Sequence, residues 1–203
     1  MSAEVERYAE SEVPTEYGTV RTIVYRVGAS ADDARPEEHV ALVVGDVTGK
    51  NAVPVLARVH SECWTGEVLH SMKCDCRAQL DQAMRAIEAA GRGVVVYLRQ
   101  EGRGIGLGNK VRAYALQAEG VDTVDANRIL GFADDARTYG VAAAILQDLG
   151  VKRVALLTNN PRKVDGLREH GIEVAERIAA TSEPNEHNAE YLAVKAKKMG
   201  HAL

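Results

Sequence analysis

Three cysteines stand close together and form the strongest chemical pattern in this chain. Cys74 and Cys76 are separated by one residue, and ten residues separate Cys63 from Cys74. Three sulfur donors at this spacing can share one tetrahedral zinc ion and leave its fourth position to water. Water on such an ion loses a proton near neutral pH and becomes a nucleophile. The spacing therefore predicts a catalytic zinc site. The alternatives are buried thiols without a metal, or a structural site closed by His60 or His70.

A glycine-rich run from Arg99 to Lys110 is the second pattern, with the sequence RQEGRGIGLGNK. Glycines let backbone N–H groups approach an anion, and Arg103 and Lys110 would supply positive charge for phosphates. The run matches neither the Walker A pattern nor the dinucleotide fingerprint. It predicts a phosphate-binding loop, and the alternative is a tight turn that serves packing.

Two further polar segments stand where chain elements are expected to begin or end. The segment TNNPRK at 158–163 follows an expected strand, which is where ligands bind in open parallel sheets. Its alternative is an Asn-Pro turn that caps a helix. Asp135 and Arg137 stand before another expected helix and could equally form an ordinary surface ion pair.

The hydrophobic pattern predicts the elements that must position these residues. Strands at 40–44 and 53–59, joined by a turn at 45–50, suggest a β-hairpin. From there the chain alternates between helices and strands, which favours a largely parallel sheet. The fold class is therefore α/β, a single domain with a mixed sheet flanked by helices and with antiparallel N-terminal strands. The expected helices span 79–90, 109–119, 137–149, 162–170 and 185–199, the expected strands 94–98, 151–157 and 172–176, and the expected loops 28–38, 99–108 and 122–135.

Composition narrows the class of protein. The chain has 203 residues, of which 46% are hydrophobic and 27% charged, so it can bury an ordinary core. Its formal charge of -4 argues against broad nucleic-acid binding. The N-terminal sequence MSAEVERYAESEV resembles neither a signal peptide nor a membrane span, which predicts a cytoplasmic protein. The odd cysteine count argues against a disulfide framework.

Longer strings resemble the GTP cyclohydrolase II family of riboflavin biosynthesis. The resemblance covers roughly residues 40–201 in the family's order and implies one α/β domain over residues 1–203 that forms a homodimer. It also implies GTP as the partner, without nucleic acid or membrane. The strings that carry it are RVHSECWTGEVLHSMKCDCRAQL, LRQEGRGIGLGNKVRAYALQ, VDTVDAN, LGFADDARTYG, LTNNPRKVDGL and EHNAEYLAVKAKKMGH.

The resemblance also implies a role for individual residues. The family's zinc ligands fall on Cys63, Cys74 and Cys76, with one Zn²⁺ per subunit, and Mg²⁺ accompanies the nucleotide. Its nucleophile falls on Arg137, its activating base on Asp135 and its catalytic tyrosine on Tyr114. The GTP-binding positions fall on Arg58, Val59, His60, Ser61, Glu62, Gln79, Glu101, Gly102, Arg103, Thr123, Thr158 and Lys163.

The implied reaction has two hydrolytic parts. Attack at the α-phosphorus releases pyrophosphate, while Mg²⁺ neutralises the phosphates. Zinc-activated water then opens the imidazole ring at C8 and releases formate, which gives 2,5-diamino-6-(5-phosphoribosylamino)pyrimidin-4(3H)-one. A guanidinium is protonated at ordinary pH and makes an unusual nucleophile. Arg137 could instead stabilise charge on the α-phosphate, with Asp135 orienting it.

Two positions depart from the family's usual pattern. Arg77 follows the CDC motif where Gly is common, and Trp64 replaces a common Leu. Two alternatives to complete turnover therefore stay open. One is an enzyme of specialised metabolism that stops at a formamidopyrimidine nucleotide, and the other is a non-catalytic nucleotide-binding protein with a structural zinc. The presence of Tyr114 favours complete turnover.

Overall fold

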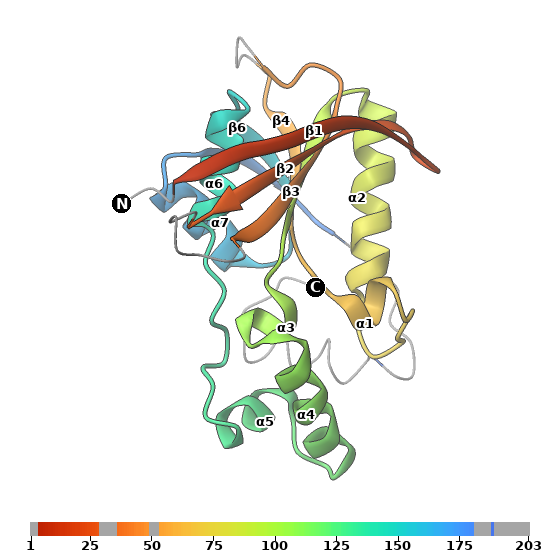
Figure 1. Cartoon of the computed structure of the whole chain (residues 1–203), viewed down its shortest axis with the longest axis vertical. Helices are drawn as coiled ribbons and strands as arrows, with labels where there is room; N and C mark the ends of the chain where they lie inside the picture. Colours follow the sequence, from red (N-terminus) through yellow and green to blue (C-terminus); the bar gives the residue numbers. More distant parts are fainter. Residues whose placement is uncertain (1–3, 29–35, 49–52, 181–187, 189–203) are drawn as a thin grey trace.

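One mixed sheet organises the computed structural model, which describes residues 4–28, 36–48, 53–180 and 188 (Figure 1). Its strand order is β1-β2-β3-β5-β4-β6-β7. The first three strands and β5 pair antiparallel, whereas β5, β4, β6 and β7 pair parallel, which confirms the predicted fold class. The strands are β1 (Val5–Thr15), β2 (Gly18–Val27), β3 (Glu37–Val44), β4 (Val55–Ser61), β5 (Gly93–Leu98), β6 (Arg153–Leu157) and β7 (Glu173–Ile178).

Helices cover both faces of this sheet. Figure 1 shows α2 on one face and α6 with α7 on the other, while α3, α4 and α5 form a lobe beyond the end of the sheet. Among the helices of the described residues, none has both the length and the hydrophobicity of a membrane-spanning segment. The helices are α1 (Trp64–Glu67), α2 (Cys76–Ala90), α3 (Glu101–Gly104), α4 (Gly106–Ala118), α5 (Thr123–Ile129), α6 (Gly140–Asp148) and α7 (Pro161–Glu169).

Strand β5 is the centre of the hydrophobic core. Its side chains alternate between the two faces, as the pleat requires. Val95 packs in the cluster that contains Met84 and Ile87 of α2. Val94 and Val96 pack in the larger cluster on the opposite face, which includes residues of α6. A strand that is apolar on both faces must lie inside the sheet, with a neighbour on each side.

The prediction that residues 40–44 and 53–59 pair with each other as a hairpin is wrong. Strand β5 lies between β3 and β4, pairing Val40 with Tyr97 on one side and Leu56 with Gly93 on the other. The two expected strands exist, but their apolar patterns do not say which strand each one pairs with. Burial of β5 decides the pairing, because its apolar surface on both faces needs an interior position.

The sequence did not predict β1, α1, α3 or α5, and one expected helix is not described. Strand β1 is polar and exposed, so it carries no alternating apolar signal. The expected loop at 122–135 contains α5, whose N-cap Asp122 accepts hydrogen bonds from the backbone N–H groups of Val124 and Asp125. The expected loop at 99–108 contains α3 and the start of α4. The helix expected at 185–199 lies outside the described residues, and the other predicted helices and the strands after residue 90 are confirmed to within three residues at each end.

The turn that follows β3 depends on a glycine. Gly45 has a φ of 64°, and a Cβ there would lie 2.3 Å from the carbonyl oxygen of Gly91. Gly28 has a φ of 70°, but no atom lies within 4 Å of a Cβ added at Gly28. We expect Gly45→Ala to lower the free energy of unfolding by about 2–4 kcal/mol, since it adds a clash to the left-handed backbone.

The matched variant Gly28→Ala carries only the backbone penalty, roughly 1 kcal/mol. Urea unfolding of both variants and the parent protein measures the difference. Equal losses of stability in the two variants would show that the close approach of Gly45 to Gly91 contributes nothing.

Candidate active site

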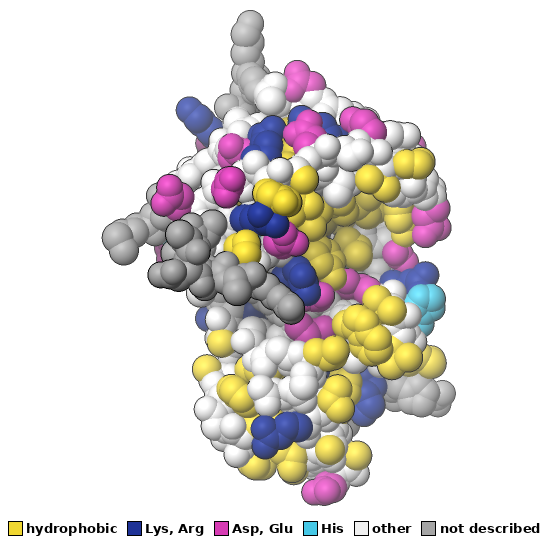
Figure 2. Space-filling model, in the orientation of Figure 1, with side chains coloured by type: hydrophobic (Ala, Val, Ile, Leu, Met, Phe, Trp, Pro, Cys, Tyr) yellow, Lys and Arg dark blue, Asp and Glu magenta, His cyan; other side chains and the backbone are white. Residues whose placement is uncertain are grey.

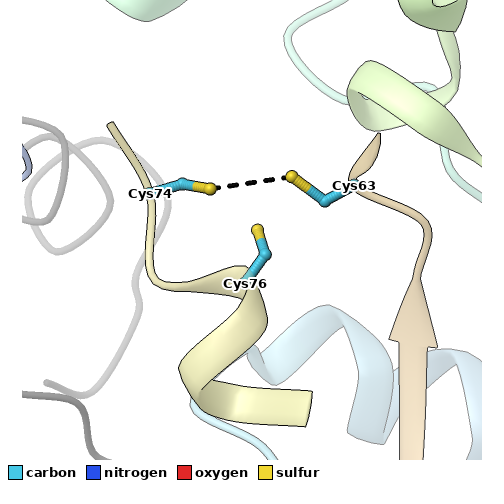
Figure 3. A group of neighbouring side chains, drawn as sticks. All are labelled: Cys63, Cys74 and Cys76. Atoms are coloured by element: carbon cyan, nitrogen blue, oxygen red, sulfur yellow. Dashed lines mark hydrogen bonds between the residues drawn. The ribbon is translucent and has the colours of Figure 1, made fainter. Parts of the chain in front are cut away.

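The three cysteines converge from two segments of the chain. Cys63 follows the end of β4, Cys74 lies in the turn before α2, and Cys76 begins α2, with all three side chains pointing toward one another (Figure 3). The sulfurs of Cys63 and Cys74 are 3.6 Å apart, and all three sulfurs lie within 4.8 Å of one another. Across the described ranges, no histidine belongs to this ligand cluster. The geometry therefore favours a site with three protein ligands.

The surroundings of the sulfurs suit a metal ion. A Cβ added to Gly66 would lie 3.0 Å from the Cys74 sulfur and 3.2 Å from the Cys63 sulfur, so glycine preserves the space beside them. Hydrogen bonds from Cys74 and Cys76 lower the pKa of the Cys63 thiol well below its ordinary value. The hydrogen bond to Cys63 raises the pKa of Cys74 to about 11. Thiolate is the form that binds metals, and a set of three sulfurs is a zinc donor set.

A cavity of about 260 Å³ opens beside the cysteines. It lies between the end of the sheet and the lobe of α3, α4 and α5, where Figure 2 shows acidic and basic side chains gathered. Ten of the predicted site residues line it: Ser61, Glu62, Cys63, Cys74, Cys76, Glu101, Gly102, Arg103, Tyr114 and Arg137. The structure thus brings the cysteines, the glycine-rich run and two of the three predicted catalytic residues to one cavity.

The glycine-rich run folds tightly against the cysteine turn. Gly102 and Arg103 adopt left-handed backbone angles, with φ values of 61° and 63°. Left-handed backbone at a residue such as Arg103 is strained and is found most often at functional sites. The backbone carbonyl of Arg103 accepts a hydrogen bond from the N–H of Ala136, at 3.1 Å. This bond joins the run to the segment that carries Asp135 and Arg137.

Lys110 lies at the sulfurs, whereas the sequence predicted a phosphate contact for it. Its ammonium is 3.1 Å from the Cys63 sulfur and 2.7 Å from Glu101 Oε1. Burial opposes the charge, but the hydrogen bond to Glu101 and the nearby sulfur outweigh it, so the pKa of Lys110 is raised. The Glu101 carboxylate also accepts hydrogen bonds from the backbone N–H groups of Trp64 and Gly102.

Tyr114 lines the cavity close to the cysteines. Its hydroxyl lies 3.4 Å from Thr65 Oγ1, which in turn is 3.7 Å from the Cys63 sulfur. Burial raises the pKa of Tyr114 to about 12. The phenol therefore keeps its proton at neutral pH and is able to donate it or a hydrogen bond.

Asp135 and Arg137 form a two-point ion pair. Nε and Nη2 of Arg137 each donate to one carboxylate oxygen of Asp135, both at 2.8 Å, and the backbone N–H of Arg137 donates at 3.1 Å. Arg162 lies 3.2 Å from the same carboxylate. Burial opposes the negative charge, but the hydrogen bonds and charges of the two arginines lower the pKa of Asp135. The predicted surface pair is in fact buried, with only 1% of the Asp135 side chain exposed.

A second group of predicted residues does not line the cavity, and two of its members, Arg58 and Lys163, are buried. Arg58 donates to the carbonyl oxygen of Leu157 at 3.0 Å and to Gln79 Oε1, and Gln79 donates to Asp75 at 2.6 Å. Burial lowers the pKa of Arg58 to about 10. Lys163 donates to the carbonyl oxygen of Val59 at 2.7 Å. These contacts hold two cations under the carboxyl ends of β4 and β6.

His60 has a partner other than the cysteines. Its Nε2 lies 2.7 Å from Glu67 Oε1, and the hydroxyl of Tyr97 donates to the other Glu67 oxygen at 2.5 Å. Burial lowers the pKa of His60 well below its ordinary value and raises that of Glu67 to about 7. The alternative in which His60 closes a structural zinc site has no support in this arrangement.

The remaining predicted positions lie at or just before the starts of α5 and α7. Asn160 caps α7 by accepting a hydrogen bond from the backbone N–H of Arg162 at 2.9 Å, so the capping alternative holds there. Thr158 is buried beside it and accepts a hydrogen bond from the backbone N–H of Asn160. Thr123 begins α5, and its side chain lies outside the described part of the chain.

The two positions that depart from the family pattern, Arg77 and Trp64, are not among the residues that line the cavity. Arg77 lies in the first turn of α2 and contacts Asp81 and His70. Its helical backbone accommodates a side chain where glycine is usual. Trp64 is 42% exposed, and Figure 2 shows hydrophobic side chains gathered over α1, which Trp64 begins.

Sequence reasoning missed several residues that shape this site. Neither Glu67 nor Tyr97 stands at a position that a motif singles out, so no sequence signal identified them. Asp75 stands between Cys74 and Cys76, and this position could have identified it as a site residue. The cavity wall also contains Lys73, Gln100, Gln117, Asp122 and Asn127.

Several known proteins of similar sequence carry names from one family or one pathway. GTP cyclohydrolase-2 of Histophilus somni (strain 2336) is 53% identical over 201 residues, covering 99% of this chain and 90% of that protein. GTP cyclohydrolase-2 of Pasteurella multocida (strain Pm70) is 51% identical, with 99% and 89% covered. Riboflavin biosynthesis protein RibBA of Bacillus velezensis is 51% identical over 98% of this chain and 48% of its own length.

One solved structure also aligns with this chain: RibBX, a two-domain 3,4-dihydroxy-2-butanone 4-phosphate synthase from A. baumannii. The alignment has a TM-score of 0.49 and 24% sequence identity, and it covers 88% of this chain and 40% of that one. The family model described as GTP cyclohydrolase II matches residues 6–179. That match covers most of the described sheet, all three cysteines and the whole cavity wall. The chain belongs to the GTP cyclohydrolase II family.

Proposed function

We propose that this chain hydrolyses GTP and releases formate and pyrophosphate, giving 2,5-diamino-6-(5-phosphoribosylamino)pyrimidin-4(3H)-one for riboflavin biosynthesis. We further propose that residues 1–203 act as one domain, as a cytoplasmic homodimer. The observation that carries the proposal is the convergence of three cysteine sulfurs on a cavity that Arg137 and Tyr114 also line. A metal donor set and a phosphate-binding cation at one cavity suit a reaction that breaks bonds at both carbon and phosphorus.

Cys63, Cys74 and Cys76 are the residues that would hold one Zn²⁺ per subunit. The space that Gly66 leaves beside the sulfurs supports this choice. When bound, zinc would supply Lewis-acid chemistry that makes water nucleophilic near neutral pH. The site offers three sulfurs from the described part of the chain, which leaves the open coordination position that catalysis needs.

Arg137 would act on the phosphate as a fixed positive charge. Asp135 holds its guanidinium at two points, and the lowered pKa keeps that carboxylate ionised. A permanently ionised carboxylate favours a protonated arginine beside it. This supports charge stabilisation at the α-phosphate, with Asp135 orienting the guanidinium, over nucleophilic attack by Arg137.

The other predicted residues would bind and orient GTP. Ser61, Glu62 and Arg103 line the cavity and carry hydroxyl, carboxylate and guanidinium groups. Arg58 and Lys163 would add positive potential behind it, while Mg²⁺ neutralises the remaining phosphate charge. Tyr114 would donate a proton or a hydrogen bond near the purine, because its phenol stays protonated.

An assay with GTP and Mg²⁺ tests the proposed reaction. We expect the parent protein to release both formate and pyrophosphate. Cys74→Ser removes one sulfur and should lower formate release by roughly 100-fold or more, because a metal-activated nucleophile is lost. Pyrophosphate without formate from the parent protein would indicate a formamidopyrimidine product. Release of neither would indicate a nucleotide-binding protein.

Gly66→Ala tests whether the space beside the sulfurs serves a metal. The added methyl group would press on Cys74 and Cys63, so we expect zinc affinity to fall by about tenfold. Gly108→Ala is the matched control, since nothing lies within 4 Å of a Cβ at that position. Competition with a chromophoric chelator measures both affinities. Unchanged affinity in Gly66→Ala would contradict a metal held at this place.

The pH dependence of stability tests the role of Asp135. A lowered pKa in the folded state stabilises the fold above the unfolded value of about 4, and this contribution is lost as pH falls through the lower folded value. Asp135→Asn should therefore be less stable than the parent by ~3 kcal/mol at neutral pH. Urea unfolding should show a constant difference from pH 8 to 5 and a smaller one below about pH 4. A difference that shrinks between pH 6 and 7 would instead make Asp135 a base near neutrality.

A further inference from the structure

The ammonium of Lys110 occupies a distinctive position between a sulfur and a carboxylate. It lies 3.1 Å from the Cys63 sulfur and 2.7 Å from Glu101 Oε1, with only 12% of its side chain exposed. Lys110 comes from α4, whereas Cys63 follows β4, so this contact joins the lobe to the sheet. An ammonium is a donor only, and both of these partners are acceptors.

Glu101 fixes where that ammonium can lie. Its side chain is 8% exposed, and Oε2 accepts the backbone N–H of Trp64 at 2.6 Å. Oε1 accepts the backbone N–H of Gly102 at 2.7 Å, in addition to Lys110. The carboxylate thus ties together the residue after Cys63, the glycine-rich run and α4. Because Glu101 is held at these points, Lys110 is directed at the sulfur.

A hydrogen bond to a ligating sulfur changes what that sulfur does for a metal. Three thiolates around a divalent cation leave one negative charge, which a buried ammonium can balance. An N–H donor also withdraws electron density from the sulfur, so the sulfur donates less to the metal. Groups that orient and tune ligands in this way commonly change metal affinity by ~10–100-fold when they are removed.

We propose that Lys110 is a positioning residue of the metal centre, which holds the Cys63 sulfur in place and reduces its electron donation through a direct hydrogen bond. This inference rests on the proposed zinc site and goes beyond it by giving the site a cationic partner. It differs from the phosphate contact that the sequence suggested, because its effect should be present with the metal alone.

The test compares Lys110→Met with the parent protein, using Zn²⁺ and Co²⁺ without nucleotide. Methionine keeps a long apolar stem and removes the donor. We expect zinc affinity, measured by chelator competition, to fall by ~10-fold or more. We expect the sulfur-to-cobalt charge-transfer band of the Co²⁺ protein to move to longer wavelength, because a sulfur without the hydrogen bond gives up an electron more easily.

Lys73→Met is the matched control. Lys73 lines the same cavity, and its ammonium lies 5.2 Å from the Tyr114 ring centroid, against 5.8 Å for that of Lys110. Its removal changes the charge of the cavity, but no hydrogen bond joins it to a sulfur among the contacts of the described residues. Zinc affinity and the cobalt band should both stay at the parent values in this variant.

Lys110→Gln keeps the inference testable if the methionine variant does not fold. An amide is a neutral donor, so the cobalt band should shift in the same direction by a smaller amount. A parent-like band and affinity in whichever Lys110 variant folds would overturn the inference and leave the proposed GTP hydrolysis intact. Equal changes in Lys73→Met would also overturn it, since general cavity charge would then be the cause. Failure of the parent protein to bind either metal would overturn both this inference and the proposed zinc site.

Discussion

The convergence of three sulfur atoms constrains the rest of this structure. Cys63 follows β4, Cys74 lies in the turn before α2 and Cys76 begins α2, so the sulfurs meet only if α2 has a fixed position along the sheet. The packing of α2 against Val95 through Met84 and Ile87 sets that position. Gly66 then leaves the room in which the sulfurs meet. The hydrophobic core therefore positions the residues of the proposed site.

Two buried cations at the cavity each have a carboxylate partner of fixed geometry. Lys110 is held by Glu101, and Arg137 is held by Asp135 at two points. Breaking such a pair leaves a buried charge without compensation, which is far less favourable than the intact pair. Lys110 also contacts the Cys63 sulfur, 47 positions away in the sequence. This contact joins the lobe to the end of the sheet and contributes to the electrostatic character of the proposed site.

The residues that meet at the cavity were easier to predict from the sequence than the pairing of the strands and the contacts between side chains. Spacing alone identified the three cysteines, and the apolar run at 94–98 identified the central strand. The partners of that strand could not be predicted, because β5 pairs with β3 and β4 through contacts that no local pattern encodes. Helix α5 was predictable in principle, since Asp122 is a good N-cap. The contact of Lys110 with sulfur was not, because a lysine beside glycines is equally suited to phosphate.

X-ray absorption at the zinc edge of the purified protein reports the number and type of atoms bound to the metal. We expect three sulfur neighbours at about 2.3 Å and one lighter neighbour near 2.0 Å that is not a histidine. A protein that retains no zinc, or one whose zinc has a histidine as its fourth ligand, would contradict the open three-cysteine site.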